Sequence, residues 1–205
     1  MKVITIANQK GGVGKSTLTT LLSLQLKRKC KVCVIDTDPQ QSLFKSISNI
    51  NKILGKEELH VYKSSIDNCI EALKQYNQFD VAVIDTMPST DVNILDLLSN
   101  SILTIVPTGV STLDINAFLN TIKLLKAIKS NYRVVFNNVK NINDLNKVKD
   151  FLVAKDIVSE VYITQAYLWS RVAYSRLFEN NLIIEDTKAK DELNYLINEL
   201  VKFGK

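Results

Sequence analysis

The chain has few cysteines, and their number and spacing exclude some common kinds of site. Only Cys30, Cys33 and Cys69 occur among its 205 residues. An odd count argues against a disulfide framework. Cys30 and Cys33 have the C-x-x-C spacing, but the second lies in a strand-like run, where residues three apart point to opposite faces, and no second pair completes a zinc site. We therefore expect structural thiols.

Long apolar runs, glycine and proline are also scarce. No run approaches the roughly 20 apolar residues that a membrane-spanning helix needs. Met1 and Lys2 lead directly into a strand-like run without the features of a secretory signal, so we expect a cytoplasmic protein. There are six glycines and three prolines, and we find no linker, low-complexity stretch or internal repeat. We expect residues 1–205 to form one domain that is long enough to bury a substantial core.

What the chain does contain is a regular alternation of two patterns. Continuous apolar runs, typical of strands covered on both faces, are separated by segments with helical spacing. The runs are Val3–Ala7, Val32–Asp36, Val81–Asp85, Ile102–Val106, Arg133–Asn137 and Val161–Ile163. The expected helices are Ser16–Lys29, Ile66–Tyr76, Asp91–Ser99, Leu113–Ser130, Asn143–Lys155, Ser170–Asn180 and Lys188–Phe203. The alternation predicts an α/β fold with a doubly wound, mostly parallel sheet and helices on both faces.

A glycine-rich loop lies between the first strand and the first helix. It consists of Lys10, Gly11, Gly12, Val13, Gly14, Lys15, Ser16 and Thr17. Glycines let successive backbone N–H groups point inward, and the helix start adds free N–H groups and a positive dipole end. The pattern is that of a phosphate-binding P-loop, in which Lys15 reaches the β- and γ-phosphates of ATP and Ser16 holds Mg²⁺.

Acidic residues end two of the predicted strands. Asp36 and Asp38 suit a site in which one carboxylate binds a metal-ligated water and the other orients the attacking water. An Asp-rich turn that caps the next helix is the alternative. Asp85 ends an apolar strand and is expected to hold Mg²⁺ through water, as a Walker B aspartate does.

The string KGGVGKST resembles the deviant Walker A motif of the ParA/MinD family of P-loop ATPases. The resemblance implies that Lys10 reaches across a dimer to the nucleotide of the partner subunit. The segment from Asp36 to Gln40 is similar to the DxDPQ switch of that family, which assigns Asp38 to hydrolysis and leaves Asp36 as a metal residue. The segment from Ile105 to Asp114 resembles the VPxxPSxLD stretch of the family, with Val110 where proline is common.

Asn137 ends a predicted strand, and its amide could pair with adenine, as in some relatives. An asparagine pair that stabilises a turn is equally consistent with the sequence.

The short length and the absence of an N-terminal extension resemble the small plasmid-partition ParA proteins, such as ParF. The resemblance implies an ATP-driven homodimer that binds non-specific DNA on the nucleoid and answers to a centromere-binding adaptor. Sequence-specific operator binding is not expected. The candidate DNA-binding residues are Arg171, Arg176, Lys188 and Lys190. The resemblance to the family implies only the region in which they lie and not the individual positions. An alternative patch consists of Lys123, Lys126 and Lys129.

Two other functions stay open. One is a MinD-like or cargo-positioning ATPase that acts on a membrane or a protein assembly. The C-terminal helix is amphipathic, but it carries Asp191, Glu192 and Glu199. A helix that binds a membrane should have a basic polar face. We therefore expect this helix to pack on the domain and expect no membrane contact. The second open function is that of a metabolic P-loop kinase, but this function gives no role to Lys10.

Overall fold

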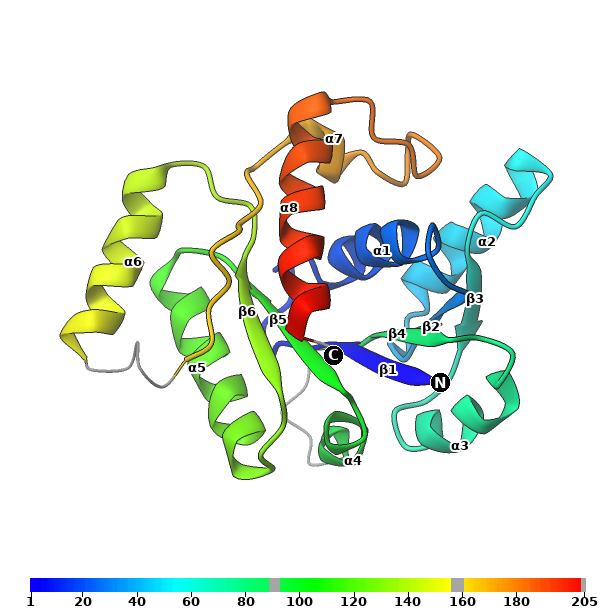
Figure 1. Cartoon of the computed structure of the whole chain (residues 1–205), viewed down its shortest axis with the longest axis horizontal. Helices are drawn as coiled ribbons and strands as arrows, with labels where there is room; N and C mark the ends of the chain where they lie inside the picture. Colours follow the sequence, from blue (N-terminus) through cyan, green and yellow to red (C-terminus); the bar gives the residue numbers. More distant parts are fainter. Residues whose placement is uncertain (89–92, 156–160, 204–205) are drawn as a thin grey trace.

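A six-stranded parallel sheet organises the protein (Figure 1). The computed structural model describes residues 1–88, 93–155 and 161–203. The strand order is β3-β2-β4-β1-β5-β6, and every pair of neighbours is parallel. The strands are β1 (Lys2–Ile6), β2 (Val32–Asp36), β3 (His60–Lys63), β4 (Val81–Asp85), β5 (Leu103–Thr108) and β6 (Tyr132–Phe136).

Helices cover both faces of this sheet, so the predicted doubly wound α/β fold is confirmed. One apolar core joins the sheet to α1 (Lys15–Leu26), α2 (Ser42–Leu54), α7 (Val172–Ser175) and α8 (Thr187–Phe203). The other core joins it to α3 (Cys69–Leu73), α4 (Ile94–Ser99), α5 (Thr112–Ala127) and α6 (Ile142–Ala154). β2 and β4 are buried along their whole length, as expected for central strands between two helical layers.

The strand register brings the chemically interesting strand ends together. Ile6 of β1 lies opposite Asp85 of β4, and Asp85 lies opposite Asp36 of β2. Thr108 of β5 lies opposite Phe136 of β6. Because all six strands are parallel, the loops that follow them share the carboxyl edge of the sheet, where ligands of such folds bind.

The structure corrects several predicted elements. Helix α2 and strand β3 were missed, although Leu43, Ile47 and Ile50 have helical spacing and are buried. Val161–Ile163 is not a strand, because it makes only an isolated bridge, from Ile163 to Val134.

The predicted helix Ser170–Asn180 is also wrong, since only the four-residue α7 forms within it. Leu177 and Leu182 are both buried in the core, and the N–H of Leu182 bonds the carbonyl of Leu177. Asn181 and Leu182 adopt positive φ, so the chain turns instead of continuing the helix. The first residues of the predicted helix Asp91–Ser99 lie outside the described residues, and its remainder corresponds to α4.

The C-terminal helix packs on the domain, as predicted. Ala189, Leu193, Leu196 and Leu200 are each at most 1% exposed and belong to the core that contains α1. None of the described helices is long and apolar enough to cross a membrane. All three cysteines are free thiols, and Cys33 and Cys69 are buried, which confirms their structural reading.

Candidate functional site

The glycine loop turns tightly between β1 and α1 and is held from β6. Gly14 caps the start of α1 with a φ of 89°, a left-handed conformation that favours glycine. A Cβ atom at Gly14 would lie 2.1 Å from Nδ2 of Asn137. That amide donates a hydrogen bond of 2.9 Å to the carbonyl of Val13. Asn137 therefore braces the loop directly, whatever it does for a nucleotide.

Lys15 is the first residue of α1 and is 7% exposed. Its ammonium group donates to the carbonyl oxygen of Lys10 at 3.0 Å, so the side chain folds back over the loop. Burial lowers the pKa of Lys15, while the carboxylates of Asp85 and Asp38 act in the opposite direction. A buried cation over a glycine loop is the arrangement that a polyphosphate neutralises.

Ser16, Thr19 and Asp85 form the polar centre beside the loop. The hydroxyl of Ser16 donates to Asp85 Oδ2 at 2.6 Å, and that of Thr19 donates to Oδ1 at 3.2 Å. Burial raises the pKa of Asp85 to about 6, and the charge of Asp36 adds to the shift, although the hydroxyl bonds and Lys15 oppose it.

This centre fits a magnesium ion. Mg²⁺ prefers hydroxyl, carboxylate and water oxygens. Ser16 and Asp85 already face each other, with Asp36 on the adjacent strand. A cation there would also favour the charged form of the buried Asp85 carboxylate.

Asp36, the last residue of β2, and Asp38, two residues later, make different contacts. Asp36 is fully buried, and its two oxygens accept the N–H groups of Asp38 at 3.0 Å and Phe44 at 2.9 Å. It thus supports the start of α2, as the turn-and-cap alternative expects. Asp38 is half-buried and accepts one N–H, from Gln40 at 2.8 Å. Its other oxygen makes no hydrogen bond within the described part of the chain, so Asp38 is the more available of the two.

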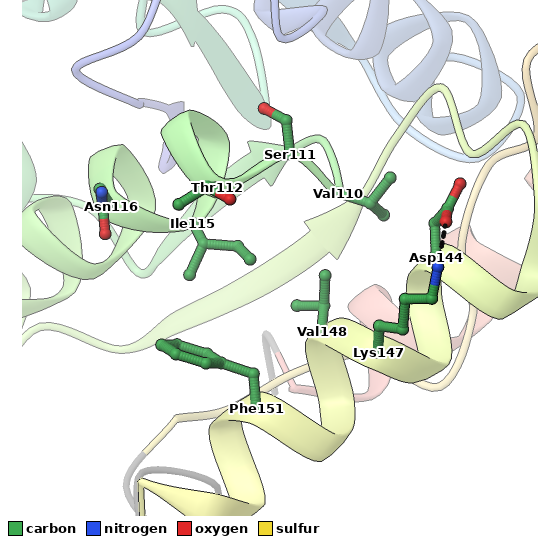
Figure 2. A pocket seen from close by; sticks show the side chains of 9 residues that line it. All are labelled: Val110, Ser111, Thr112, Ile115, Asn116, Asp144, Lys147, Val148 and Phe151. Carbon is green, nitrogen blue, oxygen red and sulfur yellow. Dashed lines mark hydrogen bonds and ion pairs between the residues drawn. The ribbon is translucent and has the colours of Figure 1, made fainter.

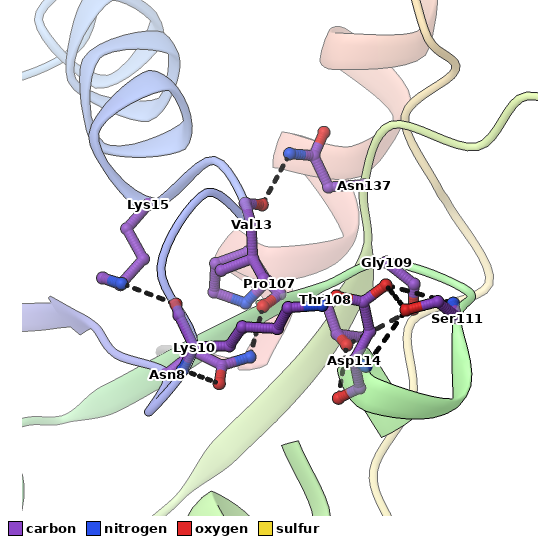
Figure 3. A network of polar contacts seen from close by, with 10 residues as sticks. All are labelled: Asn8, Lys10, Val13, Lys15, Pro107, Thr108, Gly109, Ser111, Asp114 and Asn137. Atoms are coloured by element: carbon purple, nitrogen blue, oxygen red, sulfur yellow. Dashed lines mark hydrogen bonds and ion pairs between the residues drawn. The ribbon is translucent and has the colours of Figure 1, made fainter. Parts of the chain in front are cut away.

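Lys10 is paired within its own chain (Figure 3). Its ammonium group lies 2.6 Å from Oδ1 of Asp114 at the start of α5. The other oxygen of Asp114 accepts from the backbone N–H and the hydroxyl of Ser111, which closes a capping box. Burial opposes ionisation of Asp114, but the hydrogen bonds from Lys10 and Ser111 outweigh it and lower the pKa of the carboxyl.

Gly109, which lies two residues before the N-cap Ser111, has to be small. A Cβ atom at Gly109 would lie 2.4 Å from Oδ2 of Asp114. The predicted connection after β5 is therefore shaped around the carboxylate that holds Lys10, and Asp114 does lie near the helix start, as predicted.

Sequence analysis missed Asn8, which positions the front of the loop. Asn8 is 2% exposed; its amide donates to the carbonyl of Pro107 at 2.8 Å, and its side-chain oxygen accepts the N–H of Lys10 at 3.0 Å. Asn8 therefore joins the loop to the end of β5. A polar residue directly after a buried strand was the available signal.

The candidate DNA-binding residues lie at the two ends of α7 and in the first turns of α8. The guanidinium of Arg171 donates through Nε to Oε1 of Glu192 at 2.8 Å, and it also faces Asp186 at 3.7 Å. Arg176 faces Glu179 at 3.7 Å, and both side chains are exposed. Lys188 and Lys190 are exposed and make no ion pair within the described residues.

A groove of about 470 Å³ opens beside the start of α5, between α5 and α6 (Figure 2). Ile115, Val148 and Phe151 form its apolar side. Asp144 and Lys147 pair at 3.4 Å on its α6 side. The groove therefore lies next to the helix start that holds Lys10.

The profile of the CobQ/CobB/MinD/ParA nucleotide-binding domain matches residues 4–181. The chain belongs to this family. It is therefore a ParA/MinD-type nucleotide-binding ATPase, and the predicted membership of the ParA/MinD family is confirmed.

Two curated relatives of this ParA/MinD-type protein are named for different processes. The maintenance of carboxysome distribution protein A of Halothiobacillus neapolitanus is 24% identical over 97% of this chain and 95% of its own length. The sporulation initiation inhibitor protein Soj of Bacillus subtilis is 32% identical over 64% of this chain and 46% of its own length.

Solved structures share the fold. A Borrelia burgdorferi protein assigned to plasmid partition, solved with bound AMPPNP, has a TM-score of 0.79 and 21% identity, and the match covers 98% of each chain. A variant of McdA from Cyanothece in complex with ATP has a TM-score of 0.75 and 15% identity, and the match covers 99% of this chain and 96% of the other.

Proposed function

We propose that this protein is a DNA-segregating ATPase in which ATP binding drives dimerisation and non-specific DNA binding. A centromere-bound adaptor then stimulates hydrolysis and returns the protein to its starting state. The observation that carries the proposal is that one loop contains two lysines with different surroundings. Lys15 is buried over the loop beside the Ser16–Asp85 centre, whereas Lys10 lies at the rim on Asp114.

Each part of the loop has a distinct role in this proposal. The backbone N–H groups from Gly11 to Thr17 and the ammonium of Lys15 bind the phosphates. Ser16, Asp85 and Asp36 would hold Mg²⁺, and the ion would supply Lewis-acid stabilisation of the phosphate charge at this site. Asp38, with its uncommitted oxygen, orients the attacking water. Asn137 contacts adenine from the position where it now braces the loop.

Lys10 has to change partner in this scheme. A single phosphate site needs one reaching lysine, and Lys15 already occupies that place. In a two-fold dimer the Lys10 of each subunit meets the phosphates of the other, so the Lys10–Asp114 pair opens on dimerisation. The pair is partly exposed, at 32% and 14% for the two side chains, and such pairs are weak, of about 1 kcal/mol or less. A nucleoside triphosphate bound in the partner subunit is therefore a sufficient competitor of Asp114 for the ammonium group of Lys10.

A second candidate function is the positioning of a protein assembly. It is favoured by the carboxysome distribution relative, which aligns over 97% of this chain. The ATP cycle is the same in both candidates, and only the cargo and its adaptor differ. Deleting the gene separates them in cells: a replicon is lost in the first case, whereas an assembly clusters and replicons persist in the second.

The experiment that tests the main proposal is co-sedimentation of the protein with random duplex DNA and, separately, with anionic lipid vesicles. We expect DNA binding with Mg–ATP, little with Mg–ADP, and no vesicle binding. Vesicle binding without DNA binding would support a membrane-acting ATPase instead. Absence of ATP-dependent DNA binding would contradict the proposal.

A further inference from the structure

The exposed face of α2 carries a row of polar side chains at the β3 edge of the sheet (Figure 1). Lys45, Asn49 and Lys52 have the i, i+4, i+7 spacing that places residues on one helix face, and all three are exposed. Lys63 of β3 adds a further cation, because its ammonium group lies 5.7 Å from the centre of the Phe44 ring in the first turn of α2. We call Lys45, Asn49, Lys52 and Lys63 the α2 patch.

The three lysines of the α2 patch are not compensated by carboxylates. None of them forms an ion pair within the described residues, and α2 contains no acidic residue. The ammonium group of Lys45 donates one hydrogen bond, to the carbonyl of Gln40 at 2.9 Å. An ammonium group has three N–H donors, so that of Lys45 can still bind a ligand.

The two carboxylates that follow α2 in the chain already contact basic side chains. Oε1 of Glu58 lies 2.8 Å from the ammonium group of Lys27, and Oε2 lies 3.1 Å from that of Lys56. Oε2 of Glu57 lies 2.9 Å from Nδ1 of His60. A polyanion that approaches the α2 patch therefore meets a surface with an excess of positive charge.

The candidate residues near the C-terminus are compensated to a greater degree. Arg171 is bound to Glu192 and faces Asp186, while Arg176 faces Glu179. The two exposed lysines of α8 are followed on the same helix by two acidic residues. A polyanion approaching this region meets carboxylates as well as cations, which weakens its attraction.

The start of α2 is bonded to the residues that we assign to magnesium and to the attacking water. Asp36 accepts the N–H of Phe44 at 2.9 Å, and the N–H of Gln41 bonds the carbonyl of Asp38 at 2.8 Å. A nucleotide with Mg²⁺ at this site would contact the same segment that fixes the start of α2. The α2 patch is therefore connected to the ATP site through hydrogen bonds.

A membrane surface is a poorer partner for α2 than nucleic acid. A helix that lies in a membrane interface must offer an apolar face to the lipid. The apolar face of α2 is already buried against the sheet through Leu43, Ile47 and Ile50, and the exposed Ile53 alone does not make a second one. The polar face is the one available, and it suits contacts to phosphates without insertion.

We propose that the α2 patch binds the phosphate backbone of duplex DNA. This inference rests on the proposed function and assigns the DNA contact to one surface of the molecule. From Lys45 to Lys52 the helix rises by about 10 Å, which is the axial length of about three phosphates of one DNA strand. Two patches in an ATP-bound dimer raise the apparent affinity by multivalency, which adds to the dependence of DNA binding on ATP.

The test compares two double variants that remove the same charge. Lys52→Gln with Lys63→Gln alters the α2 patch and leaves the bond from Lys45 to Gln40 in place. Lys188→Gln with Lys190→Gln is the matched control on α8. Glutamine is a good helix former, so both helices should persist. A third variant, Lys52→Arg with Lys63→Arg, changes the same side chains but keeps their charge.

Binding to a labelled random duplex is measured by fluorescence anisotropy with Mg–ATP at several salt concentrations. Melting temperature and ATP hydrolysis are measured on the same preparations to confirm folding. We expect the glutamine variant of the α2 patch to flatten the slope of log K against log salt by about 1.8 if one subunit of the dimer contacts the duplex, since each lost phosphate contact contributes about 0.9. With equal affinity extrapolated to 1 M salt, that corresponds to about 60-fold weaker binding at 0.1 M. The α8 control and the arginine variant should keep the wild-type slope.

Other outcomes overturn the inference in distinguishable ways. If the α8 variant loses binding and the glutamine variant of the α2 patch keeps it, the contact surface is on α8. If both bind like wild type, neither surface is the contact. If the arginine variant loses as much binding as the glutamine variant, the loss does not come from charge.

Two results concern the partner and not the surface. If the wild-type protein binds no DNA with ATP, the proposed function itself fails. If the wild type binds anionic vesicles and the glutamine variant of the α2 patch does not, the partner of the patch is a membrane.

Discussion

Replacing Asp85 by asparagine should stabilise the protein in the absence of nucleotide and magnesium, even though it removes a residue that we propose to hold magnesium. Asp85 is 2% exposed, and burial raises its pKa from 3.8 to about 6. A shift of about two units corresponds to about 3 kcal/mol of cost for the charged form. An amide accepts only one of the two hydroxyl bonds from Ser16 and Thr19, which removes about 1 kcal/mol of the gain.

The expected net gain is therefore about 2 kcal/mol at pH 7.5, or roughly 4–8 °C in melting temperature for a domain of this size. The folded-state pKa of this acid lies above its unfolded value, so the native state binds the proton more tightly between pH 3.8 and about 6. Stability of the wild type falls as pH rises through that window and levels off above it. The advantage of Asp85→Asn should accordingly be about a third as large at pH 5 as at pH 7.5.

The assay is thermal unfolding at both pH values, with EDTA and without nucleotide. Asp38→Asn is the control, because that carboxylate is half-buried and accepts a single N–H, and it should move the melting temperature by no more than about 2 °C. A melting temperature of Asp85→Asn below that of the wild type at pH 7.5 would refute the argument. Adding Mg–ATP should reverse the order, since the variant has lost a residue assigned to the metal.

Three further predictions follow from the contacts at the loop. Asp38→Ala should keep nucleotide affinity but slow hydrolysis by at least about 100-fold. Nucleotide binding and phosphate release are measured on the same preparation. Turnover at the wild-type rate would contradict the role assigned to this residue. Asn137→Ala removes the bond to Val13 and should weaken ADP binding about 5–10-fold; an equal loss for GDP indicates bracing of the loop, and a smaller loss for GDP indicates contact with adenine. Asp114→Asn weakens the hold on Lys10 and should raise the dimer fraction at subsaturating ATP by about 2–5-fold in light scattering, whereas a lower fraction would show that the pair supports the dimer.

The strand and loop framework could be read from the sequence because its signals are local. Continuous apolar runs identified β1, β2 and β4, and the glycines followed by Lys15 and Ser16 marked the loop. Asp36 and Asp85 were each recognised as the last residue of a strand, and the structure pairs them at one edge because parallel strands end together.

The side-chain pairings could not be read in the same way. The bond from Lys10 to Asp114 joins residues 104 positions apart, and it depends on β5 lying beside β1. The order of strands along the chain does not determine which strands are neighbours. Asn8 was missed for the same reason, because its partner Pro107 belongs to β5. The neutralisation of Arg171 by Glu192 likewise needs the fold of the segment before α8.

The central claim is that ATP assembles two chains across a shared nucleotide interface that requires Lys10. The most direct test is the mass in solution, by light scattering, of the wild type and of Lys10→Ala with saturating Mg–ATP or Mg–ADP, with nucleotide affinity measured alongside. A single chain has a mass of 23.1 kDa, so a dimer has about 46 kDa. We expect the wild type to reach the dimer mass with ATP but not with ADP, and Lys10→Ala to bind ATP and remain at the mass of one chain. A wild type that stays monomeric with ATP, or a Lys10→Ala variant that forms a normal ATP dimer, would contradict the account.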